Sequence, residues 1–104
     1  MKIFYTDHFV LPTPPGHRFP MSKYALLRER VRMLVPQEML CEPPAATDDQ
    51  IALAHDLDYI DRVQAGALSE KEIRVIGFPW SLAMVERSRR SSGATIAAAR
   101  HAIS

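Results

Sequence analysis

The sequence predicts an α/β fold with about two strands and four to five helices. Two short β-prone runs, Lys2–Thr6 and Glu38–Glu42, flank a segment whose apolar residues have helical spacing. That order is typical of a βαβ unit with parallel strands. Because parallel sheets are normally covered on both faces, so small a sheet predicts an incomplete α/β layer. We expect one partial domain over residues 1–104.

The first half of this unit is predicted from proline and apolar spacing. Residues 11–20 hold four of the eight prolines, which favours a stiff loop directly after the first strand. Ser22 is the expected N-cap of a helix that ends before Pro36. The apolar face of this helix is formed by Tyr24, Leu27, Val31 and Leu34.

The second half is predicted to be helical. Thr47 and Gln50 form a capping-box pattern at the start of a helical stretch that Gly66 ends, with Asp56 as a cap if the helix breaks there. A short helix follows Ser69.

Two further helices are expected near the end of the chain. Ser81 caps the first of them, and an alanine-rich helix over Thr95–Ile103 is built to be packed against. Ser91–Gly93 is predicted to be the turn between the two, where Gly93 allows close approach.

Composition is that of an ordinary globular protein, with 47% hydrophobic and 24% charged residues. The net charge of +1 gives no overall basic field for nucleic acid. One cysteine, Cys41, excludes an internal disulfide and is typical of a reducing cytosol, where we expect a small buried side chain. No run of about 18 apolar residues or signal peptide is present, so a cytoplasmic protein without a membrane span is predicted.

No catalytic or metal-binding residue is predicted from the motifs. His55, Asp56 and Asp58 form the one local cluster, and capping explains Asp56 better than metal binding does. Ser91–Gly93 lacks the glycines and lysine of a P-loop. The basic cluster of Arg87, Arg89 and Arg90 is expected to be a solvated helix end, and nucleic-acid binding is unlikely because no larger basic stripe accompanies it.

Two proline-stiffened loops carry aromatic residues. Residues 16–20 add the cation of Arg18 to Phe19, and residues 78–80 hold Phe78 and Trp80. Loops that leave the carboxyl ends of parallel strands form ligand crevices, and the first loop follows the first predicted strand. Their spacing leaves two interpretations open, a binding loop or a hydrophobic plug for the core.

An ordered set of segments resembles the start of zinc-dependent deacetylases of the histone deacetylase type, in the acetoin-utilisation branch of the arginase/deacetylase superfamily. The segments are Gly16-His17 with Phe19-Pro20, Ala54-His55-Asp56-x-Asp58-Tyr59-Ile60-x-Arg62-Val63, Gly77-Phe78-Pro79-Trp80, and Gly93-Ala94-Thr95-Ile96-Ala97-Ala98-Ala99-Arg100. The similarity covers nearly the whole chain.

The resemblance implies an N-terminal portion of an open parallel-sheet arginase/deacetylase fold. It also implies a parent enzyme that uses zinc to hydrolyse acetylated lysine, polyamines or similar acylated amines. Two loops would lie at the rim of the substrate channel, and their residues are His17, Arg18, Phe19 and Pro20 in the first and Phe78, Pro79 and Trp80 in the second. The second loop lacks the acidic residue that grips peptide substrates in many relatives.

The zinc ligands and catalytic histidines of that family fall beyond Ser104, so no catalytic residue and no cofactor are assigned to this chain. The chain alone is expected to be inactive. An alternative is a naturally truncated, non-catalytic protein that self-assembles or binds a partner. In that case exposed apolar surface predicts a homo-oligomer.

Overall fold

The computed structural model describes residues 1–9 and 20–104. Helices make up 61% of the structure and strands 4%. The elements are β1 (Ile3–Phe4), α1 (Ser22–Arg32), the 3₁₀ helix η1 (Gln37–Met39), β2 (Leu40–Cys41), α2 (Asp48–Ala52), α3 (Leu57–Ala65), α4 (Glu70–Ile76) and α5 (Leu82–Ile103).

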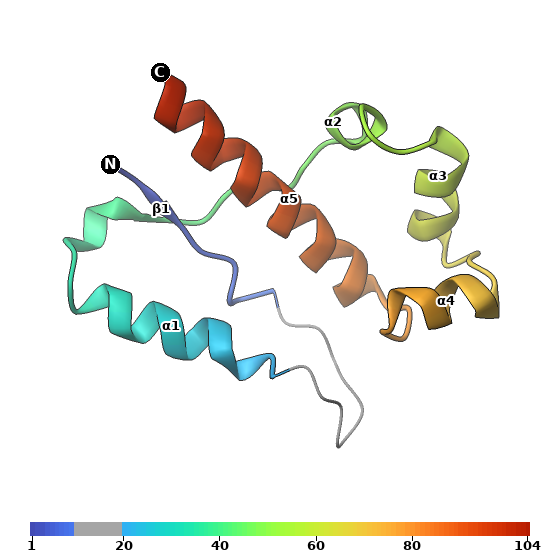
Figure 1. The fold of residues 1–104 in the computed structure, drawn as a ribbon, viewed down its shortest axis with the longest axis horizontal. Coiled ribbons are helices and arrows are strands. Elements are labelled where there is room, and N and C mark those ends of the chain that lie inside the picture. Colours follow the sequence, from blue (N-terminus) through green and yellow to red (C-terminus); the bar gives the residue numbers. More distant parts are fainter. Residues whose placement is uncertain (10–19) are drawn as a thin grey trace.

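Helix α5 is the longest and most central element of the structure. It crosses the middle of the view in Figure 1, with β1 and α1 on one side and α2, α3 and α4 on the other. The molecule measures 44 × 36 × 17 Å, with a radius of gyration of 15.3 Å. A compact domain of this length has a radius of gyration of about 13 Å. The chain therefore forms a flat slab.

The predicted fold class is wrong, although the parallel strand pair is present. β1 and β2 pair in parallel with Ile3 opposite Leu40 and Phe4 opposite Cys41. Each strand has only two residues, so the pair is a small ladder in a mainly helical fold and not part of an arginase/deacetylase sheet. The apolar runs that suggested strands were too short to support more, and Pro43 and Pro44 end the second run.

Side-chain caps set most helix starts where they were expected. Thr47 and Gln50 bond reciprocally at the start of α2, at 3.2 and 2.9 Å. Ser69 accepts a bond of 3.1 Å from the Glu72 backbone N–H, and the Glu72 carboxylate completes a second capping box. Ser81 accepts a bond of 3.0 Å from the backbone N–H of the third residue of α5. Gly66 ends α3 in the left-handed region at φ 70°.

Three local expectations need correction. Ser22 is the first helical residue of α1, and its N-cap position is occupied by Met21 without a side-chain bond. Asp56 takes the N-cap position of α3, also without a side-chain bond. Ser91–Gly93 is not a turn, because α5 runs unbroken for 22 residues.

A small core lies where α5 begins. Met84 and Val85 are buried there, with Met21, Val63, Ile76, Phe78 and Trp80 packed around them. Among the described residues only five hydrophobic side chains are buried, and none of them belongs to α1. Leu27, expected on the buried face of α1, is 61% exposed. Cys41 is half-buried.

Candidate functional site

A groove lies between α5 and the pair α2–α3, and we call it the α3–α5 groove. Its volume is about 770 Å³, within the size range of small-molecule sites. The apolar wall includes Ile51, Ile60, Val63, Ile76, Phe78 and Ile96. Its polar lining comes from His55, Tyr59, Arg87, Ser88, Arg89, Ser91, Ser92 and Thr95.

Met21 and Phe78 come together in this groove. Met21, at the N-cap of α1 and not among the predicted rim residues, and Phe78, from the second predicted loop, both pack on the buried pair Met84 and Val85 and both line the groove. Pro20 is exposed. His17, Arg18 and Phe19 lie outside the described residues.

The other residues of the second loop lie differently. Pro79 is exposed, whereas Trp80 is half-buried. The indole Nε1 of Trp80 donates a hydrogen bond of 2.7 Å to the Val63 carbonyl. Its ring covers Gly66, where an added Cβ would lie 3.1 Å from the ring. Trp80 therefore anchors the second loop to the end of α3, and Phe78 is the residue of this loop that faces the groove.

The basic cluster on α5 is not a solvated helix end. Arg87 is only 8% exposed, and its guanidinium lies 4.4 Å from the centre of the Tyr24 ring. The same side chain donates a hydrogen bond of 3.3 Å to the Phe9 carbonyl. A guanidinium combines stacking with several donors, so Arg87 ties Phe9, after β1, and Tyr24 of α1 to α5.

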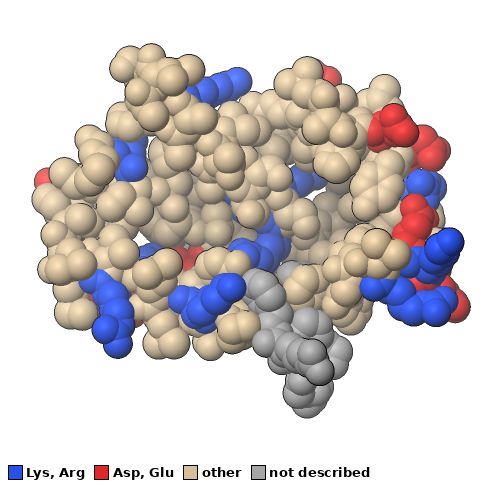
Figure 2. All heavy atoms as spheres, in the orientation of Figure 1, with Lys and Arg blue, Asp and Glu red and all other residues tan. Residues whose placement is uncertain are grey.

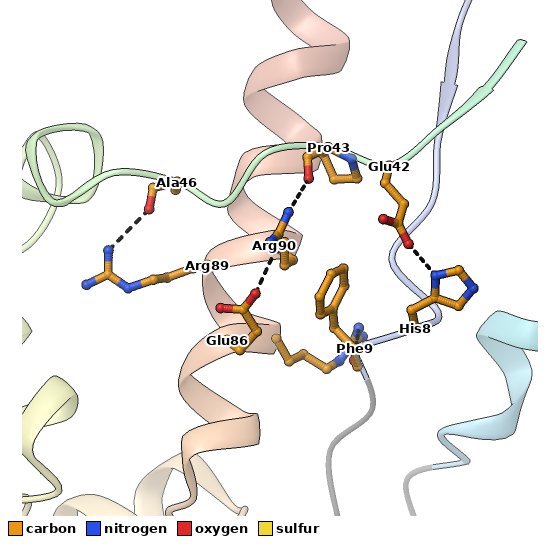
Figure 3. A network of polar contacts seen from close by, with 9 residues as sticks. His8, Phe9, Glu42, Pro43, Ala46, Glu86, Arg89 and Arg90 are labelled. Atoms are coloured by element: carbon orange, nitrogen blue, oxygen red, sulfur yellow. Dashed lines mark hydrogen bonds and ion pairs between the residues drawn. The ribbon is translucent and has the colours of Figure 1, made fainter.

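Arg90, one turn further along α5, also bonds to the segments that pack beside the helix (Figure 3). Its guanidinium donates to the Pro43 carbonyl at 2.8 Å and to the Glu86 carboxylate at 2.9 Å. It also stacks over the Phe9 ring at 4.5 Å. Because proline has no N–H, the chain around Pro43 cannot satisfy itself in a ladder, and Arg90 supplies a donor from the helix.

Arg89 fixes the segment that leads into α2. It donates to the Ala46 carbonyl at 3.2 Å and to Gln64 at 2.8 Å, and it pairs with Asp48 at 2.6 Å. The backbone completes the link, because the Ala46 N–H bonds to the Arg89 carbonyl at 2.9 Å. The three arginines thus point into the molecule, and sequence reasoning missed this role. The signal available was the Pro43-Pro44 pair, whose carbonyls need donors from elsewhere.

A second group of charges lies near β1. His8 pairs with Glu42 across the end of the strand pair (Figure 3). Asp7, with a side chain 7% exposed, lies 3.1 Å from the Arg28 Nε, a suitable ion-pair distance without hydrogen-bond alignment. Arg28 also stacks on Tyr5 at 4.7 Å. These pairs join β1 to α1 and to the end of β2.

The best-defined electrostatic effect lies at the corner between α3 and α4. The backbone N–H of Ser69 and then the Arg62 guanidinium hold the pKa of the Glu72 carboxyl below its ordinary value. The same carboxylate, followed by Asp58, raises the pKa of Arg62. Arg62 and Glu72 therefore form a structural ion pair on the surface, because both side chains already bond to other groups of the chain.

The residues needed for a metal site do not come together in the described part of the chain, where no three His, Cys, Asp or Glu side chains converge. His55 stacks on Tyr59 with ring centres 5.9 Å apart, while Asp58 pairs with Arg62 at 3.0 Å. The described residues therefore do not fit zinc.

A membrane-spanning helix must be both long and apolar. None of the helices formed by the described residues is both long enough and apolar enough to cross a bilayer.

Comparison with known proteins gives one informative match. No known family model matches the chain. An uncharacterized protein of the cyanobacterium Picosynechococcus sp. is 33% identical over 103 residues, which is 97% of this chain. The chain spans about a third of that relative's length, 34%. A similar sequence thus occurs within a longer polypeptide.

Proposed function

We propose that this chain supplies substrate-contacting loops to a zinc-dependent deacetylase that hydrolyses small acylated amines. In this proposal the metal and the catalytic histidines belong to another part of a longer protein, and the 104-residue chain alone is inactive. The bound zinc would polarise the amide carbonyl and activate water. The lone, half-buried Cys41 is compatible with a reducing cytoplasm as the location.

The convergence of Met21 and Phe78 is the observation that supports this proposal. Met21 and Phe78 reach the same buried pair from segments far apart in sequence. Both side chains also line the α3–α5 groove, where apolar groups outnumber charged ones. An aromatic ring at the mouth of such a groove can pack on the methylene stem of an acylated amine.

The second loop also bears on the class of substrate. Residues 77–80 are Gly, Phe, Pro and Trp, so this loop has no carboxylate to hold the backbone of a peptide. The indole N–H of Trp80 is already bonded within the chain. We therefore favour acetylated polyamines and related small amines over acetylated peptides.

The test uses the intact Picosynechococcus relative and a chimera in which this chain replaces the matched third. Each is assayed for zinc-dependent release of acetate from an acetylated polyamine and from an acetyl-lysine peptide. We expect hydrolysis of the polyamine that is lost on chelation and restored by zinc. In the chimera, Phe78→Ala should raise KM about tenfold, equivalent to about 1.4 kcal/mol of lost apolar contact.

The exposed neighbour of Phe78 provides the control, because Pro79→Ala should leave KM within about twofold. Absence of amide hydrolysis by both the relative and the chimera, with zinc present, would refute the proposed activity. An equal effect of the two substitutions on KM would refute the role of Phe78.

A second candidate is a non-catalytic, self-assembling protein. It is favoured by the apolar residues that α1 and the following turn leave exposed, which are Leu26, Leu27, Met33 and Leu34. Sedimentation equilibrium of the 104-residue chain separates the candidates, since self-assembly requires a mass that rises with concentration. A monomer at about 100 μM would exclude an oligomer of ordinary micromolar affinity.

A further inference from the structure

The slab is thin and has a small core. Its shortest dimension is 17 Å. Domains are built from at least two packed layers around a core, whereas the described residues bury only five hydrophobic side chains. The α3–α5 groove leaves one face of α5 without a packed layer over it.

The two faces of α5 differ in what covers them. One face is held closely against the segment after β2, where Gly93 is buried and its position approaches the Pro44 carbonyl. The other face lines the α3–α5 groove and carries Ser91, Ser92 and Thr95, all exposed. These side chains are small, so another backbone can approach this face closely.

The two arginines that line the groove are engaged within the chain. Figure 2 shows acidic and basic side chains gathered at the margin over α3 and α4, and basic side chains also toward the middle of that face. Arg87 and Arg89 line the groove, but both already donate to carbonyl groups within the chain. The rest of the lining consists of apolar side chains, hydroxyl groups, the Gln50 amide and the His55 imidazole. Such a surface fits an apolar face of polypeptide with a few polar groups.

The longer relative indicates which polypeptide this is. Its similarity extends over 97% of this chain, yet the match uses only 34% of the relative, so a similar unit exists beside additional chain of about twice its own length. We propose that the α3–α5 groove is a docking surface for the polypeptide that accompanies this unit in the longer protein. A face of 44 by 36 Å is large enough for a standard interface, which takes about 800 Å² from each partner.

Cysteine labelling tests the docking surface without any substrate, so its result is independent of the deacetylase proposal. In a Cys41→Ser background, Thr95→Cys places a thiol on the exposed groove face of α5. Ala65→Cys places the control thiol on α3, also exposed but outside the groove lining. Both variants are prepared as the 104-residue chain and within the chimera with the relative.

We expect both thiols to react equally fast in the 104-residue chain. In the chimera, Thr95→Cys should react at least about tenfold more slowly, because labelling then requires local opening of the interface. Ala65→Cys should keep its rate. If the chimera does not fold, cysteines are introduced at the two aligned positions of the intact relative, where the same difference is expected.

Three results would overturn the proposal. Equal rates for the two thiols in the folded chimera or relative would mean that the groove is open. Equal protection of both would mean that this groove is not the specific surface. Protection of Thr95→Cys that appears in the 104-residue chain as its concentration rises would identify a second copy as the occupant.

Discussion

Gly93 offers a test in which helix propensity and packing predict opposite signs. It lies in the interior of α5, where replacing glycine by alanine normally stabilises a helix by about 1 kcal/mol. The structure leaves no room for the added methyl group. A Cβ at Gly93 would lie 2.0 Å from the Pro44 carbonyl oxygen and 3.1 Å from the Ala46 nitrogen.

The size of the effect follows from what must move. Ordinary contact begins near 3.4 Å, so the backbone after β2 would have to shift by more than an ångström. Overpacking of this kind costs about 1–3 kcal/mol. The shift also endangers the bond of 2.9 Å between the Ala46 N–H and the Arg89 carbonyl, worth about 1 kcal/mol. After subtracting the helix gain, we expect Gly93→Ala to lower the free energy of unfolding by about 1–3 kcal/mol.

Thermal unfolding followed by circular dichroism at 222 nm measures this change. For a domain of this size, about 1 kcal/mol moves Tm by about 4–8 °C, so Gly93→Ala should lower Tm by about 4–24 °C. The matched control is Ser92→Ala, at the exposed neighbouring position of the same helix, which should raise Tm by a few degrees at most. A higher Tm for Gly93→Ala than for the wild type would refute the close approach of α5 to Pro44.

Three other substitutions test the contacts that tie the elements together. Trp80→Phe removes the donor to the Val63 carbonyl and should cost about 1 kcal/mol, seen as a lower denaturation midpoint in urea; an unchanged midpoint would contradict the anchor. Arg90→Met leaves the carbonyl that it caps after β2 without that donor and should cost about 1–3 kcal/mol by the same assay, whereas a stabilised variant would argue against it. Glu72 has a lowered pKa because of the Ser69 N–H and the nearby guanidinium, so its stabilising effect is present above its ordinary pKa of 4.5 and is lost as the pH falls through the lower folded value. The Tm advantage of the wild type over Glu72→Gln should therefore shrink between about pH 7 and about pH 3, and a constant difference would contradict the assigned contacts.

Local signals were sufficient to place most helix boundaries. Thr47, Ser69 and Ser81 each cap the helix that the sequence assigned to them, because a capping bond spans only three residues and depends little on tertiary context. Gly66 ends α3 for an equally local reason, since it is in the left-handed region. The parallel pairing of β1 with β2 was also predicted from order alone.

Tertiary contacts explain where the predictions were wrong. Ser91–Gly93 has the composition of a turn, yet it is helical because Gly93 lets α5 lie against the Pro44 backbone. The predicted fold class was wrong because the extent of the sheet was overestimated. Short apolar runs indicate a possible strand, but they do not indicate how many residues pair. Arg87 and its neighbours were assigned to solvent because their backbone acceptors lie 43 to 78 residues away in sequence.

The candidate site was predictable only in part. The sequence singled out the loop around Phe78, and Phe78 lies beside the buried pair together with Met21. It did not indicate the α3–α5 groove, whose lining combines residues of α2, α3, α4 and α5 with residues of the segments between helices. The sequence also did not show that Phe78 and Trp80 have different roles. The hydrogen bond from the Trp80 indole to the Val63 carbonyl shows that Trp80 anchors the loop within the chain.

The dependence on α5 has a consequence for synthesis on the ribosome. The arginine bonds that hold Phe9, Pro43 and Ala46 all originate from residues 87–90. The segments around Phe9, Pro43 and Ala46 therefore cannot complete their packing before α5 has been synthesised. At about 5–20 residues per second, a nascent chain would expose β1 and α1 for roughly 5–20 s. We expect trigger-type chaperones that cover emerging apolar segments to raise the soluble yield, and a chain ending before residue 87 to be degraded.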